Sequence, residues 1–385
     1  MRVLLVSTDN PYITLLGGKH IHLLLLEKGL KELGVKVVTH YYNPKDLWEQ
    51  IKRSTRLIVG GKYGYKYKIK WMINYLRRNI PENTFEIIHA HDVLSLISTG
   101  ERAAPKILTL HGYFARENIE FIKSKKAREE LYPYLLKLER EGIENAEYVI
   151  TVDQRLKEYI ISEFNYPASK ISVMHNAIDT EMFRPISKEE QNKLKKKQGF
   201  SENDTIILVP RRLVEKNGVI YAVQAMRHIK NRKVRMVIAG DGPEKDKLVK
   251  EANGDDRIYF AGLIPHDKIV PYYFMADIIL IPSITSHGVQ EASSLAMLEG
   301  MACSKVTICS DIGGMHEIIQ NMKNGILVKE KDSESIAKAI ETTITNQSLI
   351  ADIGRNAREY VLKHHSFIAH ARKVYDLYHN VLRIR

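Results

Sequence analysis

The stretch Ile278–Ile319 constrains the fold most, because its pattern predicts a strand, a loop, a helix and a second strand in immediate succession. The apolar run at its start stops at Pro282, which is typical of a buried parallel strand. Ser293 or Ser294 can cap a helix with apolar residues on one side, and a second apolar run predicts the next strand. Such a unit places a ligand-sized site where the loop meets the helix.

Two carboxylates, Glu291 and Glu299, frame the start of this helix. With both on one helix, a rise of ~1.5 Å per residue separates them by roughly 12 Å, so they are not expected to act as an acid–base pair. The free N–H groups of the first turn between them favour an anion. An anion between two groups that bind hydroxyls describes a nucleotide sugar. The alternative is an ordinary amphipathic helix that carries two solvated glutamates.

The same stretch carries a family signature, namely Pro282-Ser283, a loop, two glutamates separated by seven residues, and Gly300-Met301-Ala302. It resembles the retaining glycosyltransferases of family four, which have the GT-B fold. The resemblance implies that Glu291 binds hydroxyls of the donor sugar and that Glu299 binds the ribose. Ala292-Ser293-Ser294 replaces the usual Gly-Phe-Gly, and the preceding loop is long, so the donor sugar is left open.

Charge and apolar patterning limit the classes of partner. The net charge of +12, from 58 basic and 46 acidic residues, is compatible with nucleic acid, anionic membranes or phosphorylated ligands. No nucleic-acid-binding module is evident, so no nucleic-acid partner is expected. No apolar run reaches about eighteen residues, and the apolar run at the N-terminus predicts a strand rather than a signal peptide. With Cys303 and Cys309 as its two cysteines, the chain is expected in a reduced, cytoplasmic compartment.

The first residues predict a strand, a turn at Gly17-Gly18 and a helix that ends at Gly34. A nicotinamide-binding site is disfavoured because Gly-x-Gly-x-x-Gly is absent. The unit also resembles the first strand and helix of the family, in which glycines let the backbone approach the donor phosphates or the acceptor. On this basis Gly18 is assigned to the donor, and Gly17 and His22 to the acceptor side.

The segment Lys52–Arg78 is basic and aromatic, with Trp71 among lysines and tyrosines. One interpretation is a patch on the acceptor side that contacts anionic membrane, which would place the protein peripherally on the inner face. The other is a solvated helix face with extended lysines.

Histidines follow two predicted strands of the first half of the chain. His89 and His91 end one strand with Asp92, and His111 ends another. Polar residues at the carboxyl ends of parallel strands line the binding crevice of an open sheet, although only one or two of the first group can face it. These residue types can ligate metals, and a buried structural histidine is also an alternative. The resemblance implies that His111 lies beside the transferred sugar and that His91 lies on the acceptor side.

Residues 171–185 resemble the family's crossing between two domains, and Asn176 in it is assigned to the acceptor side. The expected domains are residues 1–175, which bind the acceptor, residues 176–365, which bind the donor, and a helix over 366–385 that returns to the first domain. A long helix is expected over 126–145, and the lysine-rich segment 188–197 predicts a solvated surface helix.

Cations after the first strand of the second domain suit a diphosphate. The family pattern matches Arg212, whereas Asn217 occupies the family's lysine position and Lys216 precedes it. Arg212 and Lys216 are both assigned to the diphosphate. The predicted catalytic residues are His111, Glu291, Arg212 and Lys216, and the predicted donor-binding residues are Glu299, Ser293, Ser294, Leu295, Gly18, Gly240 and Gly242.

These observations predict a GT-B enzyme with two Rossmann-like domains whose parallel sheets face a central cleft. It is expected to transfer a hexose from a UDP- or GDP-linked donor, with retention, to an envelope-related glycan or a lipid-linked acceptor. No Asp-x-Asp occurs, so neither a metal nor a cofactor is expected. Two alternatives stay open, a nucleotide-sugar 2-epimerase of the same fold and a nucleotide-sugar-binding protein that has lost catalysis.

Overall fold

The computed structural model describes residues 1–12, 18–43, 61–82, 84–120, 122, 124–286 and 288–384. Gly17 and the first residues of the basic and aromatic segment lie outside the described residues. The chain divides into two compact units, Met1–His175 with His370–Arg385 (unit 1) and Asn176–Ala369 (unit 2). The sequence placed the corresponding boundaries after residues 175 and 365.

Unit 1 contains a six-stranded sheet in the order β2-β1-β3-β4-β5-β6, and all of its strands are parallel. This agrees with the predicted parallel sheet, which the alternation of strands and helices along the chain favours. The strands are β1 (Arg2–Ser7), β2 (Lys36–Tyr41), β3 (Ile87–Ala90), β4 (Lys106–Leu110), β5 (Tyr148–Thr151) and β6 (Ile171–Val173). The helices are α1 (Gly18–Glu32), α3 (Gly61–Asn79), α4 (Val93–Ser98), α5 (Phe114–Glu120), α6 (Lys125–Glu144), α7 (Gln154–Phe164) and the short η1 (Ala168–Lys170).

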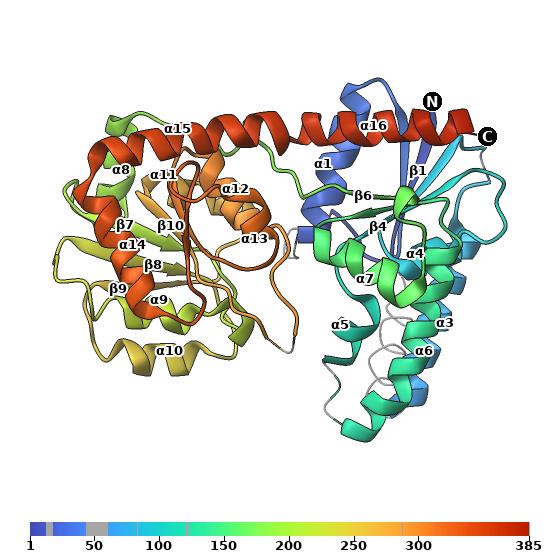
Figure 1. Ribbon diagram of the computed structural model, residues 1–385, viewed down its shortest axis with the longest axis horizontal. Helices are drawn as coiled ribbons and strands as arrows, with labels where there is room; N and C mark the ends of the chain where they lie inside the picture. The colour runs from blue at the N-terminus through green and yellow to red at the C-terminus, as the bar shows by residue number, and fades with distance from the viewer. Residues whose placement is uncertain are drawn as a thin grey trace. The chain divides into compact units, whose positions relative to one another are not determined.

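Alternate residues of β1 enter different cores, because successive side chains of a strand point to opposite faces. Val3 and Leu5 pack with α1 and with the C-terminal helix α16 (Phe367–Ile384). Leu4 and Val6 pack on the other face, with Ile80 just after α3. Figure 1 shows α16 in red beside the blue α1. Helix α16 therefore shares one core with α1 and β1.

Unit 2 contains a second parallel sheet, in the order β12-β11-β10-β7-β8-β9. Its strands are β7 (Thr205–Val209), β8 (Val234–Ala239), β9 (Ile258–Gly262), β10 (Ile278–Ile281), β11 (Val306–Ser310) and β12 (Ile326–Val328). Its helices are α8 (Lys188–Lys197), α9 (Val219–Ala225), α10 (Lys245–Ala252), α11 (Val270–Met275), α12 (Leu295–Ala302), α13 (Gly313–Ile318), α14 (Ser333–Thr345) and α15 (Gln347–His364), with short η2 (Glu215–Asn217) and η3 (His266–Lys268). Two six-stranded parallel sheets confirm the predicted α/β class.

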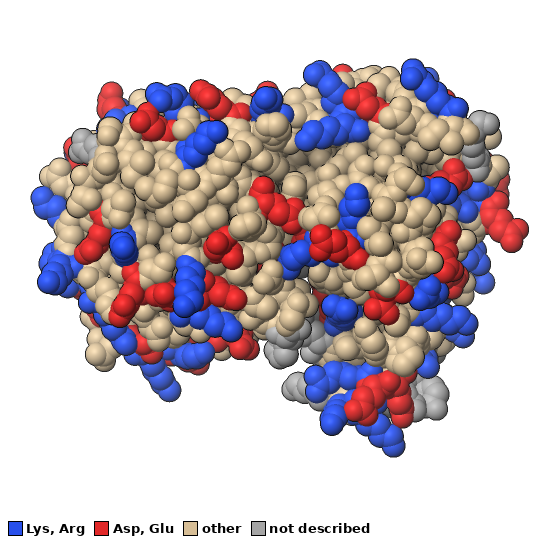
Figure 2. Space-filling view, viewed as in Figure 1, with Lys and Arg blue, Asp and Glu red and all other residues tan. Residues whose placement is uncertain are grey.

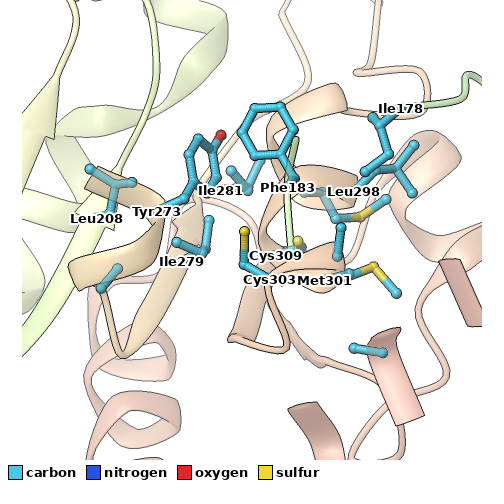
Figure 3. Close-up of a cluster of buried hydrophobic side chains, with 14 of the residues drawn as sticks. Ile178, Phe183, Leu208, Tyr273, Ile279, Ile281, Leu298, Met301, Cys303 and Cys309 are labelled. Atoms are coloured by element: carbon cyan, nitrogen blue, oxygen red, sulfur yellow. The ribbon is translucent and has the colours of Figure 1, made fainter. Parts of the chain in front are cut away.

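The core on one face of this sheet holds α12 in place. Ile279 and Ile281 of β10 contact the apolar side of α12, including Leu298 and Met301, as Figure 3 shows. Cys303 and Cys309 lie in the same cluster, where burial raises the pKa of both thiols. Both cysteines therefore serve as core residues of this unit. The opposite face of the sheet packs against α9 and α14.

The prediction of a solvated helix over residues 188–197 is wrong for one face of α8. Lys195 is only 1% exposed, and its Nζ lies 2.6 Å from Asp277 Oδ2. Gln191, one turn earlier, donates to the backbone carbonyl of Ala276 at 2.9 Å. A lysine count cannot reveal such a face, because the half-buried carboxylate that compensates Lys195 is 82 residues away in sequence.

Charged side chains of both signs are interspersed over the face drawn in Figure 2. Among the helices in the described part of the chain, none combines the length and the apolarity needed to cross a lipid bilayer.

Candidate functional site

Arg211 is the centre of a polar network in unit 2. It follows β7, and its guanidinium reaches the loop after β10, because both strands end at the same edge of the sheet. Its Nη2 lies 2.7 Å from Glu291 Oε2 and 2.9 Å from Ser283 Oγ, and its Nη1 lies 3.2 Å from Ser294 Oγ. The side chain of Arg211 is only 9% exposed. The network therefore joins three parts of the predicted signature through one cation.

Asn217 fixes the orientation of this arginine. Its Oδ1 accepts from Arg211 Nη2 at 2.6 Å, and its Nδ2 donates to the backbone carbonyl of Arg212 at 2.7 Å. Asn217 is 6% exposed and occupies the position at which the family pattern has lysine. In this chain that position therefore orients a neighbouring cation instead of supplying one.

Glu291 lies in the loop before α12, which begins at Leu295. The assumption that Glu291 and Glu299 share one helix is therefore wrong, and the estimate of their separation along its axis does not apply. Burial raises the pKa of Glu291, but the charge of Arg211 and its hydrogen bonds outweigh burial, so the pKa is lowered overall. Glu291 is accordingly a carboxylate at neutral pH and can accept hydrogen bonds from hydroxyl groups.

Ser293 and Ser294 do not cap α12 with their side chains, although Ser294 occupies the N-cap position. Ser294 Oγ accepts from Arg211, whereas Ser293 Oγ accepts the backbone N–H of Asn176 at 3.0 Å. Asn176, assigned to the acceptor side, also donates its Nδ2 to the carbonyl of Ser293 at 3.2 Å within unit 2. Leu295 packs on the core beneath α12. The first turn of α12 thus keeps N–H groups that no serine side chain caps, and such groups favour an anion.

Gly240 and Gly242 let the loop after β8 lie directly on the loop after β7. A Cβ on Gly240 would come within 1.9 Å of the Arg211 carbonyl oxygen, and one on Gly242 within 2.3 Å of the Leu213 carbonyl oxygen. The N–H of Leu213 also donates to the carbonyl of Asp241 at 3.0 Å. Both predicted donor-binding glycines therefore shape the loop that carries the arginines.

Arg212 and Lys216, the cations assigned to the diphosphate, are both exposed in the loop between β7 and α9. Lys216 lies close enough to Glu291 to lower its pKa, and its carbonyl accepts the N–H of Ile284 at 2.9 Å. The two adjacent arginines thus differ in environment. Arg211 is buried in the network, whereas the exposed side chain of Arg212 is accessible to a ligand.

Glu299, on α12, is 4% exposed, and its Oε1 lies 2.8 Å from Nε2 of His266 in η3. Burial lowers the pKa of His266, but the hydrogen bond and the charge of Glu299 outweigh burial, so the pKa of His266 is raised. Sequence reasoning missed His266, because it matches no motif.

In unit 1, helix α1 and the residues that follow β3 and β4 bring His22, His91 and His111 together. One ring nitrogen from each lies within 4.8 Å of the others.

Gly18 is the first residue of α1, and Lys19 follows it. Lys19, which the sequence did not single out, lies 2.7 Å from Asp92 and 2.9 Å from Asp9. Sequence reasoning found the three histidines but not this half-buried ion pair beside them.

His89 has a structural role. Its Nδ1 lies 2.6 Å from the Tyr378 hydroxyl of α16, and its Nε2 lies 2.6 Å from Thr109 Oγ1. Both ring nitrogens are therefore occupied. This is the alternative of a buried histidine, and it leaves His91 and His111 at the strand ends.

The described part of the basic and aromatic segment is α3. Trp71 packs edge-on against Tyr42 and lies 5.8 Å from the ring of Tyr75, so it belongs partly to the fold. Tyr67 is 50% exposed, and Lys70 and Arg78 are exposed.

Comparison with known proteins covers both units. The protein-family model described as Glycosyltransferase Family 4 matches residues 16–182. The family model described as Glycosyl transferases group 1 matches residues 190–360. An uncharacterized glycosyltransferase of Methanocaldococcus jannaschii is 31% identical over 235 residues, which are 60% of this chain and 59% of that relative. The matched region thus spans less than two thirds of that relative.

Two further similarities extend over most of the chain. A phosphatidylinositol N-acetylglucosaminyltransferase subunit of Arabidopsis thaliana is 26% identical over 90% of this chain and 74% of that protein. The structure of sucrose-phosphate synthase from Thermosynechococcus elongatus has a TM-score of 0.79 at 19% identity, with both chains covered completely, and shows the same fold. The family predicted from the signature is confirmed: the chain belongs to the group 1 glycosyltransferases of family four and has the GT-B fold.

Proposed function

We propose that this protein transfers a hexose from a nucleotide sugar, with retention of configuration, to an envelope-related or lipid-linked acceptor. The observation that carries the proposal is the carboxylate of Glu291, held by Arg211 beside the start of α12. The Arabidopsis relative is named as part of a phosphatidylinositol N-acetylglucosaminyltransferase, and this name supports a lipid-linked acceptor.

The proposed chemistry follows from the charges of unit 2. Cleavage of the donor gives an oxocarbenium-like transition state and a diphosphate that gains negative charge. The exposed cations Arg212 and Lys216 and the N–H groups of α12 would stabilise that charge without reorganising. Glu291 would accept hydrogen bonds from sugar hydroxyls. His111, which burial keeps neutral by lowering its pKa, would offer an uncharged imidazole beside the sugar.

A donor screen followed by product analysis tests this proposal. Thermal unfolding in the presence of UDP-, GDP- and ADP-sugars should identify one donor that raises the midpoint, because a ligand that binds only the native state stabilises it. The linkage of the product should then have the anomeric configuration of the donor, as measured by nuclear magnetic resonance. An inverted linkage, or sugar epimerisation without any acceptor, would contradict the proposed transfer.

Replacing Glu299 by alanine is expected to weaken nucleotide binding roughly ten- to a hundredfold, because a hydrogen bond between a charged group and a ribose hydroxyl contributes ~1.5–3 kcal/mol. Calorimetric titration with the free nucleotide measures this. Glu359, exposed on α15, provides the control variant Glu359→Ala, for which unchanged affinity is expected. Equal affinities of the two variants would remove Glu299 from the nucleotide site.

Chelation is expected to leave the transferase activity intact, because fixed cations and amides can stabilise the diphosphate in place of a divalent metal. The initial rate would be measured before and after dialysis against EDTA. Loss of activity that Mg²⁺ or Mn²⁺ restores would contradict this prediction.

The exposed residues of α3 lead us to propose reversible attachment to anionic membranes, at the cytoplasmic face. Each basic residue near such a surface contributes ~1 kcal/mol, and salt weakens the attraction. We therefore expect the protein to sediment with phosphatidylserine vesicles at low salt and to dissociate at high salt.

The double variant Lys70→Glu, Arg78→Glu should stay in the supernatant at low salt. The control Lys230→Glu, Lys233→Glu, on exposed residues of unit 2, should still sediment. Without sedimentation of the unaltered protein at low salt, a solvated face is the correct interpretation of α3.

A further inference from the structure

The three histidines of unit 1 are arranged as metal ligands usually are. His22 comes from α1, His91 follows β3 and His111 follows β4, and one nitrogen from each lies within 4.8 Å of the other two. Imidazole nitrogen is a preferred ligand of Zn²⁺, and three histidines with one open position form a known type of zinc site. We propose that His22, His91 and His111 bind a divalent transition-metal ion such as Zn²⁺.

The environment of His91 gives the main reason for a ligand at this place. His91 is 1% exposed, and neither of its ring nitrogens has a hydrogen-bond partner among the described residues. The buried Nε2 of His111 also lacks one. Most buried polar side-chain atoms in proteins are hydrogen-bonded, and an exception indicates water, an ion or a functional role. A metal ion would satisfy one nitrogen of each of these two rings.

The charged groups beside the cluster also allow a cation. The nearby ammonium group of Lys19 is compensated by Asp92 and Asp9, so the net charge beside the cluster does not oppose a cation.

His89 supports the cluster without joining it. Its two nitrogens are bound to Tyr378 and Thr109, and its ring stacks 4.5 Å from that of His91. This contact restricts the orientation of the His91 ring, and preorganised ligands favour binding. His370 of α16 packs edge-on against His22, with their ring centroids 4.9 Å apart, and so covers another side of the histidine cluster.

The proposed site does not depend on the proposed transfer reaction. The diphosphate is assigned to unit 2, so the metal-free protein is expected to be active. An ion held by His111 would, however, prevent that side chain from contacting a sugar. Added Zn²⁺ should therefore inhibit, although EDTA should not.

Cobalt spectroscopy tests the site directly. The full-length protein without an affinity tag would be titrated with Co²⁺, whose tetrahedral complexes absorb visible light far more strongly than its octahedral complexes in water. We expect an absorption band that saturates at one equivalent and that Zn²⁺ abolishes by displacement. His91→Gln should weaken Co²⁺ binding by more than about 100-fold, since even changes to residues behind the ligands typically cost 10–100-fold. His316→Gln, which alters an exposed histidine paired with Asp311 in unit 2, should bind Co²⁺ as the unaltered protein does.

His22→Gln provides a second variant in case His91→Gln does not fold, and thermal unfolding without metal shows which variants are folded. Loss of the band in a folded variant of His91 or His22 supports the proposed ligands. Absence of a saturable band in the unaltered protein would overturn the proposal, and so would a band that persists in a folded variant.

Discussion

Replacing Glu291 by alanine is expected to lower kcat roughly ten- to a hundredfold while leaving nucleotide affinity nearly unchanged. Glu291 is a carboxylate at neutral pH and is proposed to bind hydroxyls of the transferred sugar, and a hydrogen bond to a charged group contributes ~1.5–3 kcal/mol. Steady-state rates at saturating donor, together with calorimetric titration by the nucleotide, separate the two effects. An unchanged kcat would remove Glu291 from the sugar site.

The same experiment extends to Arg211, because its guanidinium holds Glu291 at 2.7 Å. Arg211→Ala should lower kcat by a similar factor, and the double variant should be little worse than either single variant, since the two residues act as one unit. Arg212→Ala provides a matched control for position. If Arg212 contacts the diphosphate directly, its effect should combine multiplicatively with that of Glu291→Ala. If the reductions in kcat caused by Arg211→Ala and Glu291→Ala multiply in the double variant, the positioning role of Arg211 is contradicted.

The Glu-x7-Glu signature was recognisable because its residues are close in sequence and its strand, loop and helix follow one another. The buried arginine was not, because two adjacent arginines after a strand look equivalent until one side chain is seen to turn inward. Asn217 was the available signal. An amide in place of a lysine suggests a changed set of hydrogen bonds, and the structure shows that it fixes Arg211. The short distance between Glu299 and His266 depends on the packing of η3 near α12, which no local pattern predicts.

The apolar runs identified the strands, and Gly34, with φ of 79°, ends α1 near the predicted position. The buried faces of the helices are harder to predict, because a lysine-rich helix indicates a solvent-exposed element unless the partners of its lysines are known. The spacing of Gln191 and Lys195 at i and i+4 put both on one side of α8, and this was the one sequence signal for a buried face.

Replacing Lys195 by methionine is expected to destabilise unit 2 by about 3 kcal/mol. Breaking a buried ion pair by removing one partner typically costs about 3–5 kcal/mol, because the remaining charge is left uncompensated. Asp277 is itself 23% exposed and keeps Lys188 Nζ at 3.7 Å, the backbone N–H of Ile206 at 2.9 Å and the amide of Gln191 at 3.0 Å, which favours the lower end of that range. Methionine keeps the apolar stem of Lys195, so the change reports mainly on the charge and on the lost bond to the Asp204 carbonyl. Denaturant unfolding followed by circular dichroism measures it.

Lys196→Met is the matched control, because Lys196 is the next residue of the same helix and forms an exposed pair with Glu202. Exposed pairs contribute at most about 1 kcal/mol, so this variant should unfold close to the unaltered protein. The two variants remove the same charge from the same helix and have the same composition. A large difference in unfolding free energy between them therefore isolates burial as the cause. Equal midpoints would mean that Asp277 remains solvated or is otherwise compensated when Lys195 is absent, and that α8 is held by its apolar contacts alone.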